Sequence, residues 1–342
     1  MKKRHVNVPV FIPHLGCPND CVFCNQRTIS GVKEFRAEEV VPIIEETLTT
    51  VSKDDYVEIA FFGGSFTGID RDLMENLLNI ANGYLKQGRI DSIRCSTRPD
   101  YINDDVLDIL YRYGVRHIEL GIQSASEDVL QAAKRGHGIS DTKTACRLIK
   151  ERGFTLGGQM MIGLPSASGC DEISTAELIC SLGADEARIY PTIVFKATEL
   201  CHMTESGEYT PLDIEEAVSR SADAFSVFVR NGVKVLRIGL CDSENLHSGS
   251  TYFAGPNHAA MGELVENEYY FRAICEKLDS INIESNSDLT VCVAKGHMSK
   301  VIGQHKKNKI RLCQKYGFRT FRVTESDDVS AYGVLLRISE RI

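Results

Sequence analysis

Three cysteines lie within eight residues near the start of the chain, at Cys17, Cys21 and Cys24. They follow the run from Val6 to Ile12, which is rich in β-branched residues and ends where Pro and Gly begin. Such a run predicts a strand, so the three thiols are expected on a loop at its C-terminal end. Thiolates are soft metal ligands, and their close spacing therefore indicates a metal-binding loop.

The number of thiols bears on the kind of metal. Structural zinc usually takes two pairs of ligands, whereas the nine other cysteines lie singly between Cys95 and Cys313. Three thiolates suit an iron–sulfur cluster with three protein-bound irons and one open iron. Two alternatives stay open, a zinc site completed by His14 or a distant residue and a set of three reduced, buried thiols. The C-x3-C-x2-C spacing favours the cluster, because free core cysteines have no reason to follow it.

The same spacing, with the aromatic Phe23 before the last cysteine, resembles the signature of the radical S-adenosylmethionine (SAM) enzymes. The resemblance implies a [4Fe–4S] cluster on Cys17, Cys21 and Cys24, with the methionine part of SAM on the open iron and Phe23 among the cofactor-binding residues. It also implies a one-electron donor of the flavodoxin or ferredoxin type. Reductive cleavage of SAM would give a 5′-deoxyadenosyl radical that abstracts hydrogen from a substrate, so the chain is expected to be an enzyme.

Composition limits the class of protein. The chain has 342 residues and 43% hydrophobic content, which is enough for one large barrel and a small additional unit. Its apolar runs are far shorter than the ~20 residues that cross a bilayer, so we expect no membrane span. Twelve cysteines in a chain of this length, three of them clustered, favour a reducing compartment, and we expect a cytoplasmic protein.

Strands and helices alternate after the cysteine loop up to about residue 240, which predicts parallel βαβ units. With the first strand, the expected strands span residues 6–12, 56–62, 92–96, 116–121, 155–161 and 186–192. Six units are fewer than the eight of a closed barrel, so we expect a partial (β/α)6 TIM-type barrel with ligands at the C-terminal strand ends. The expected domains are a barrel over residues 1–245 and a C-terminal α/β extension over residues 246–342.

Gly63, Gly64 and Ser65 follow the second expected strand. Two glycines there could form an ordinary βα turn. Behind a cysteine triplet they resemble the radical SAM glycine motif, which implies that this backbone lies along the amino group of SAM. Many family members have Glu or Asp in place of Ser65.

Three further residues belong to motifs that resemble those of the Elongator catalytic subunit. The similarity covers roughly residues 5–240. Ser96 stands where that family has an acidic residue toward the SAM ribose. Gln123 and Arg135, which also resemble oxygen-independent coproporphyrinogen III oxidase, are implied to lie near the adenosine and the carboxylate of SAM. Without the resemblance, Arg135 would be an ordinary surface base. No acetyltransferase motif follows, so Elongator-type acetyl transfer is not implied.

The C-terminal part has its own signals. Residues 261–278 predict a helix, and a strand, a broken helix and a second strand follow over residues 289–294, 298–316 and 318–323. Between Leu289 and Thr324 there are nine Lys or Arg and no Asp or Glu, whereas the rest of the chain has 30 basic and 47 acidic residues. Such a run predicts a positively charged surface that faces a polyanion.

Residues 301–310 resemble the nucleotide-clamping GxxG loop of KH RNA-binding modules, with Lys306 in place of the second glycine. We therefore expect Lys306, Lys307 and Lys309 to contact RNA. A solvated basic helix is the alternative interpretation.

The sequence thus predicts a radical SAM enzyme that modifies tRNA or another RNA. Two alternatives are a radical SAM enzyme on a small metabolite, similar to coproporphyrinogen oxidase, and a non-catalytic, metal-stabilised RNA-binding protein. No residue is assigned as catalytic.

Overall fold

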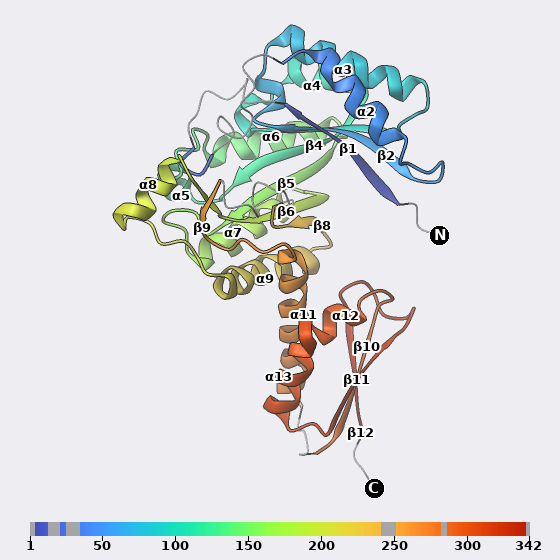
Figure 1. Cartoon of the computed structure of the whole chain (residues 1–342), viewed down its shortest axis with the longest axis vertical. Coiled ribbons are helices and arrows are strands. Elements are labelled where there is room, and N and C mark those ends of the chain that lie inside the picture. Colours follow the sequence, from blue (N-terminus) through green and yellow to red (C-terminus); the bar gives the residue numbers. More distant parts are fainter. Residues whose placement is uncertain (1–3, 13–20, 25–34, 241–250, 282–285, 340–342) are drawn as a thin grey trace.

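A curled, open sheet of seven parallel strands forms the larger part of the molecule (Figure 1). The computed structural model describes residues 4–12, 21–24, 35–240, 251–281 and 286–339. In spatial order the strands are β1 (His5–Ile12), β2 (Tyr56–Gly63), β3 (Ser92–Thr97), β4 (Val115–Gln123), β5 (Thr155–Ile162), β6 (Glu186–Pro191) and β8 (Lys234–Ile238). The six predicted strands and the partial barrel are confirmed. The seventh strand, β8, was missed.

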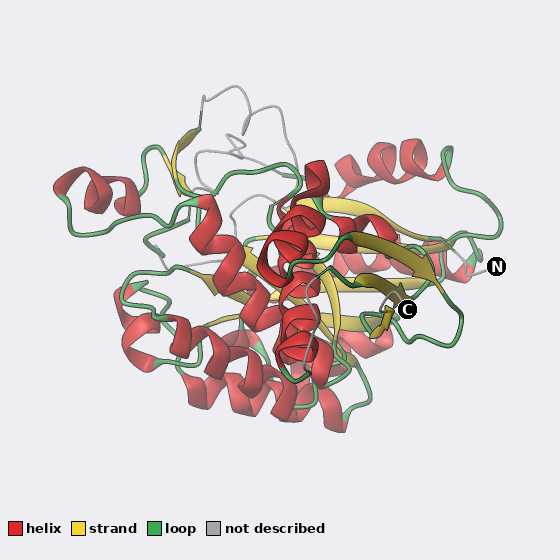
Figure 2. Ribbon diagram, turned by 90° about the horizontal axis from the view of Figure 1, so that it is seen from below, coloured by secondary structure: helices red, strands yellow, loops and turns green. Residues whose placement is uncertain are grey.

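Helices follow the strands and cover the outer, convex face of the sheet (Figure 2). They are α2 (Val40–Leu48), α3 (Arg71–Lys86), α4 (Asp104–Arg112), α5 (Glu127–Ala132), α6 (Ile139–Glu151), α7 (Gly169–Ser181) and α9 (Ile214–Arg230). Outward-pointing strand side chains such as Ile59, Phe61 and Ile118 are fully buried against these helices. Among the described helices, none is long and apolar enough to cross a membrane.

The inner, concave face of the sheet is polar. Side chains alternate along each strand, so the neighbours of the buried apolar residues point inward. Inner-face residues of β2 to β6 are Glu58, Ala60, Phe62, Arg94, Ser96, His117, Glu119, Gly121, Gly157, Gln159, Met161, Glu186, Arg188 and Tyr190. The lower part of this face, toward the N-terminal ends of the strands, is filled by ion pairs rather than by aliphatic side chains.

Arg94 is the centre of these ion pairs and is completely buried. Its guanidinium donates to Glu58 at 2.6 Å, to Glu119 at 2.5 Å and to Glu186 at 3.0 Å. These carboxylates come from β2, β4 and β6, so one side chain on β3 ties four strands together. Burial lowers the pKa of the adjacent His117, which keeps its ring neutral.

A smaller α/β unit follows the barrel. It consists of α11 (Met261–Asp279), β10 (Asp288–Val293), α12 (Met298–Ile302), α13 (Lys307–Tyr316), β11 (Thr320–Glu325) and β12 (Val334–Ser339). The predicted helix, strand, broken helix and strand are confirmed, and β12 was missed. β10 is central, parallel to β11 and antiparallel to β12. The domain boundary at residue 245 and the KH-like character stay predictions.

Aromatic rings join this unit to the barrel. Phe225 of α9 makes edge contacts with Tyr269 of α11 and with Tyr332 before β12, at ring-centre distances of 5.3 and 5.0 Å. The small unit is therefore packed against α9 rather than tethered by a linker.

A small sheet of β7 (Val194–Phe195) and β9 (Tyr252–Ala254) and helix α8 (Glu199–Ser206) lie beside the C-terminal ends of the barrel strands (Figure 1).

A first prediction concerns Arg94. We expect Arg94→Met to lower the free energy of unfolding by about 3–5 kcal/mol, because three buried carboxylates lose their shared cation and only Glu119 keeps a second buried arginine, Arg188. Denaturant unfolding measures this loss. Arg147→Met is the matched control, since Arg147 forms only an exposed i,i+4 pair with Glu151 and should change stability by a small fraction of that amount. Equal effects of the two changes would contradict the role of Arg94.

Candidate cofactor site at the strand ends

Two of the three predicted cluster cysteines lie at the C-terminal end of the barrel. Cys21 is buried and Cys24 is half-buried, and the Cys24 amide donates to the Cys21 carbonyl at 2.9 Å. Between them, the amide of Val22 donates to Ala133 and its carbonyl accepts from Leu200. The segment is thus held between α5 and α8. Cys17 lies outside the described residues.

Phe23 is half-buried and packs against two apolar clusters. One cluster contains Val129 and Leu164, and the other contains Val194 and Leu200. Phe23 therefore anchors the segment that carries Cys21 and Cys24 to the barrel.

Arg135 lies directly beside Cys21. Its Nη1 donates to the Cys21 sulfur at 3.5 Å and its Nη2 to the carbonyl of Gly121 at 2.9 Å. The guanidinium is only 8% exposed, and its Nε has no hydrogen-bond partner among the described residues. Arg135 is therefore a site residue and not a surface base, with one buried donor left for a further group.

Gly121 and Gln123 shape the end of β4 around this arginine. A Cβ at Gly121 would lie 2.6 Å from Arg135 Nη2 and 2.9 Å from Gln123 Nε2, so a larger residue there would displace one or both side chains. The pairing register with β5 shifts between Gly121 and Gln123, and Gln123 has a left-handed φ of 69°. Its Oε1 accepts from Gln159 Nε2 at 3.5 Å. The irregular strand end thus turns a polar amide toward the site.

Gly63 ends β2 opposite Ile12, the last residue of β1. Its φ is +125°, and a Cβ there would lie 2.1 Å from the Ile12 carbonyl oxygen. Gly64 follows it and is half-buried. The predicted requirement for glycine is therefore met at Gly63, where two strand ends meet just before the cysteine loop.

Ser65 and Ser96 use their hydroxyl groups differently. Ser65 is buried, contacts Thr97 Oγ1 at 2.7 Å and accepts from the Arg98 amide at 3.3 Å. Ser96 belongs to the inner face and stays partly exposed. Of these two serines, Ser96 therefore presents its side chain to the interior of the barrel.

Behind these serines lies a charged group that the sequence did not indicate. Arg98 is 1% exposed and donates to both carboxylate oxygens of Asp100, at 2.9 and 3.0 Å. His137 lies 4.0 Å from the same carboxylate. Burial, followed by the charges of Arg135 and Arg98, lowers the pKa of His137 to about 4, so its ring is neutral at pH 7. Ser96 was predicted at this strand end, but the burial of the neighbouring Arg98 could not be inferred from the sequence.

The residues present suit an iron–sulfur cluster with an anionic cofactor. Cys21 and Cys24 supply two soft ligands, and Arg135 supplies a buried donor without a partner. No described group of three His, Cys, Asp or Glu could hold a metal. Cys17 and His14 lie outside the described residues, so the third cluster ligand and the alternative zinc site stay predictions.

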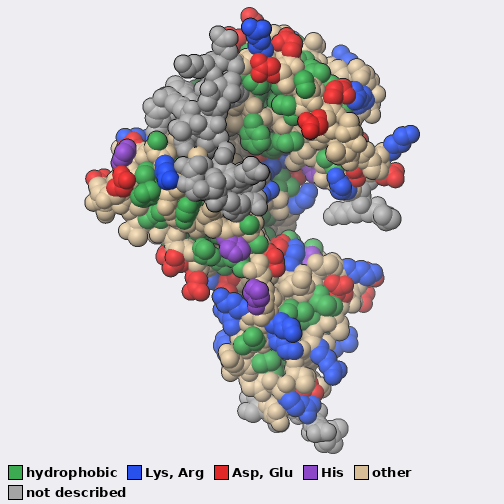
Figure 3. All heavy atoms as spheres, viewed as in Figure 1, with side chains coloured by type: hydrophobic (Ala, Val, Ile, Leu, Met, Phe, Trp, Pro, Cys, Tyr) green, Lys and Arg blue, Asp and Glu red, His purple; other side chains and the backbone are tan. Residues whose placement is uncertain are grey.

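The basic run of the C-terminal unit is less positive than its composition suggested. Six of its nine Lys and Arg residues form ion pairs with acidic residues of other segments, namely Lys295–Asp327, Lys300–Glu266, Lys307–Glu215, Arg311–Glu268, Lys315–Asp279 and Arg319–Asp288. Figure 3 shows acidic side chains among the basic ones on this unit. Lys306 and Lys309 make no ion pair with a described residue. Of the three predicted RNA contacts, these two remain uncompensated.

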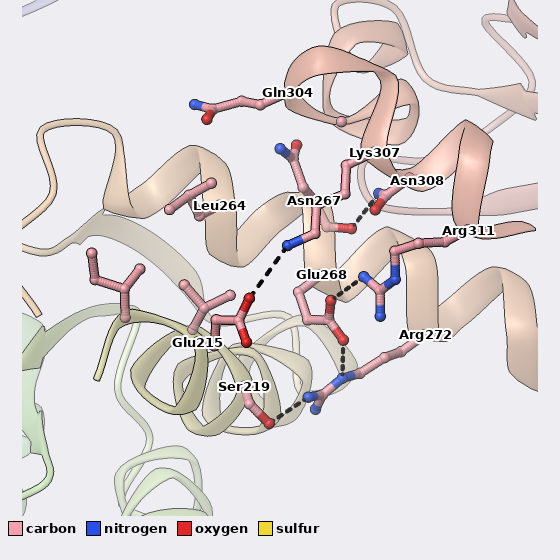
Figure 4. Close-up of a pocket in the computed structure, with 13 residues that line it drawn as sticks. Glu215, Ser219, Leu264, Asn267, Glu268, Arg272, Gln304, Lys307, Asn308 and Arg311 are labelled. Carbon is pink, nitrogen blue, oxygen red and sulfur yellow. Dashed lines mark hydrogen bonds and ion pairs between the residues drawn. The ribbon is translucent and has the colours of Figure 1, made fainter. Parts of the chain in front are cut away.

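A cleft of about 390 Å³ lies where α13 and α11 meet α9 (Figure 4). Its charges are paired across the junction. Glu268 accepts from Arg272 and Arg311, which hold its pKa below the usual range although burial opposes this. Arg272 also donates to Ser219 of α9 at 2.7 Å. The cleft is thus part of the junction that fixes the small unit.

Comparison with family models gives two matches. Residues 11–179 match the Radical SAM superfamily, and residues 184–270 match the Radical_SAM C-terminal domain. An uncharacterized protein of Methanocaldococcus jannaschii is 30% identical over 237 residues, which are 65% of this chain and 71% of that protein.

Two longer relatives are proteins with named activities or complexes. A tRNA uridine(34) acetyltransferase of Methanocaldococcus infernus is 34% identical over 134 residues, 38% of this chain and 25% of that protein. Human Elongator complex protein 3 is 28% identical over 189 residues, 48% of this chain and 35% of that protein. The chain therefore spans only a quarter to about a third of these two relatives.

Among solved structures, the archaeal Elp3 of Methanocaldococcus infernus superimposes with a TM-score of 0.62 at 22% identity. The match covers 81% of this chain and 64% of that one. It shows the same barrel fold.

A second prediction concerns Gly63. We expect Gly63→Ala to lower the free energy of unfolding by more than about 2 kcal/mol, because the added Cβ adds a backbone clash to an unfavourable φ. Gly88→Ala is the control: Gly88 also has a positive φ, of 67°, but has open space around it, so its cost should be about 1 kcal/mol. Chemical denaturation of both variants tests this, and equal losses would show that the contact with Ile12 carries no cost.

Proposed function

This chain belongs to the radical SAM superfamily, and from that membership we propose that it cleaves SAM reductively to modify tRNA or another RNA. The observation that carries the proposal is the position of Cys21, Cys24 and Arg135 at one end of a barrel of this family. The similarity to two archaeal tRNA uridine(34) acetyltransferases supports an RNA substrate.

The cofactors of the superfamily are a [4Fe–4S] cluster and SAM. Cys17, Cys21 and Cys24 would hold the cluster. When bound and reduced, the cluster would supply one electron to SAM, whose cleavage would give methionine and a 5′-deoxyadenosyl radical. A flavodoxin or ferredoxin would deliver that electron, and twelve cysteines in a chain of this length, three of them clustered, fit a cytoplasmic location.

The residues at the strand ends bind and orient SAM in this proposal. The backbone of Gly63, Gly64 and Ser65 would contact its amino group, while the Ser65 hydroxyl is already engaged with Thr97. Arg135 places a charged donor beside Cys21, where an anionic carboxylate is stabilised. Ser96 and Gln123 offer a hydroxyl and an amide to the nucleoside part from neighbouring strands.

The α12–α13 turn is the proposed RNA contact. Gly303, His305 and Lys306 all have positive φ there, of 77°, 51° and 62°. Lys306 thus adopts the backbone conformation that a second glycine of a GxxG loop would favour. Lys306 and Lys309 are both exposed beside this turn, and Lys307 contacts Glu215 only at 3.8 Å. Phosphate groups of RNA would find two uncompensated cations at this place.

A third prediction tests the cluster. Anaerobically prepared protein should be brown and contain about four irons per chain, and Cys21→Ala should lose both properties because two thiolates are too few to hold a cluster. Iron analysis and visible absorption measure this. Cys201→Ala, which removes another buried thiol packed against Val22, should keep its iron. Stoichiometric zinc without visible absorption would contradict the proposed enzyme.

A fourth prediction tests the RNA contact. Replacing Lys306 and Lys309 together with Ala should weaken tRNA binding and flatten the log–log salt slope by up to about 1.4, or ~0.7 for each lost single-strand contact. Fluorescence anisotropy between low and moderate salt measures both quantities. The control variant replaces the ion-paired Lys295 and Lys315 with Ala and should change the slope less.

The outcomes of that titration separate the alternatives. An unchanged slope in the Lys306/Lys309 variant would leave the run as a solvated face. If the parent enzyme cleaves SAM but binds no RNA even at low salt, a small-metabolite substrate would replace RNA.

A further inference from the structure

The upper inner face of the barrel is lined by small side chains. Ser96 of β3 and Gly121 of β4 lie there. Ala60 and Gly157 belong to the lower level, because Ala60 pairs in register with Arg94 and Gly157 with Glu119 and Glu186, and both are buried. Partly exposed larger residues surround Ser96 and Gly121, namely Phe62, Gln159, Met161, Arg188 and Tyr190. The barrel interior is therefore reached by solvent at this level.

An aromatic pair borders this region at the edge of the sheet. Val10 and Ile12 of β1 are buried against the helices, so Phe11 between them points to the inner face. Its register partner is Phe62, and the two rings lie 6.0 Å apart at 41°. Phe11 is 65% exposed. Phe11 and Phe62 thus place two adjacent apolar rings on an otherwise polar inner face.

The groups around this pair are polar but carry little net charge. Arg188 lies over the Phe62 ring at 5.4 Å, and Glu119 neutralises it through two hydrogen bonds of 2.6 and 2.9 Å. Burial raises the pKa of Tyr190, so its hydroxyl stays neutral. The Gln159 amide has only a weak contact of 3.5 Å with Gln123. Such a lining suits a neutral, hydrogen-bonding ring better than an anion.

The position of this lining connects it to the chemistry. Gln159 lies beside Gln123, one of the proposed SAM contacts. In the described part of the sheet β1 pairs only with β2 and β8 only with β6, so the barrel has an open side next to Phe11. A substrate group that enters through this open side can reach the C-terminal strand ends, where the cofactor is proposed to bind.

We propose that this face binds one base of the RNA substrate, stacked on Phe11 and Phe62 and hydrogen-bonded by Gln159 and Tyr190. The inference rests on the proposed RNA-modifying function. Outside the basic run the chain has 30 basic and 47 acidic residues, which repel the phosphate backbone, so the neutral base enters alone. Such extrusion of a base into a pocket is how enzymes reach base atoms for chemistry.

The absence of tryptophan from the sequence makes a direct test available. Phe11→Trp introduces a single indole at the proposed stacking position in the cluster-containing enzyme. Addition of a single-stranded RNA should quench its fluorescence saturably, because a base stacks on the ring. Tyr111→Trp places the indole on the outer helix α4, where Tyr111 is 52% exposed, and should show no quenching. An abasic oligonucleotide of the same length, which has the phosphate backbone without bases, should bind Phe11→Trp without quenching it.

A second measurement does not depend on fluorescence. Phe11→Ala should weaken binding of the same RNA by about 5- to 150-fold, the range given by loss of one base stack. Tyr111→Ala is the control and should retain the parent affinity. The iron content of both variants, measured in parallel, verifies that the site is intact.

The outcomes are distinguishable. An enzyme that binds RNA with the parent affinity in Phe11→Ala, and without quenching in Phe11→Trp, contradicts this inference alone. A parent enzyme that binds no RNA contradicts the proposed function. An RNA base is then excluded as the group that stacks on Phe11 and Phe62.

Discussion

The buried guanidinium of Arg94 is the interaction on which the barrel depends. Three carboxylates from three other strands converge on it, and without this cation they would be buried charges at the centre of the fold. Because ion pairs fill the lower inner face, the strands need no aliphatic plug there. The sheet can therefore curl around a polar interior and leave its upper end open for ligands, as the exposed parts of Phe62, Ser96 and Arg188 show.

The strand ends above this network are shaped by backbone constraints. Gly63 permits two strand ends to approach, and Gly121 leaves room for the guanidinium that contacts Cys21. The left-handed Gln123 breaks the ladder where its amide must turn inward. Residues far apart in the chain thus meet at one end of the barrel, as parallel βαβ topology requires.

Much of the fold and part of the site could be predicted from the sequence. Six strands were recognisable because apolar, β-branched runs alternate with amphipathic helices. The missed strands β8 and β12 have half-buried patterns with charged residues, such as Lys234 and Arg337, which resemble loops or surface segments. The ion pairs of the basic run were beyond prediction, because their acids come from other segments such as Glu215, Glu266 and Asp279. The burial of Arg98 and His137 likewise depends on tertiary packing and has no local pattern.

The junction of α9 and α11 gives the molecule a fixed span. Rings of Phe225, Tyr269 and Tyr332 interlock across it, and Arg272 bonds to Ser219 and Asp223 of α9. The separation between the α12–α13 turn and the barrel opening is thus set by side-chain packing and not by a flexible linker. An RNA held at both proposed contacts would have to bridge a constant length, so this junction would select substrates by their length as well as by their bases.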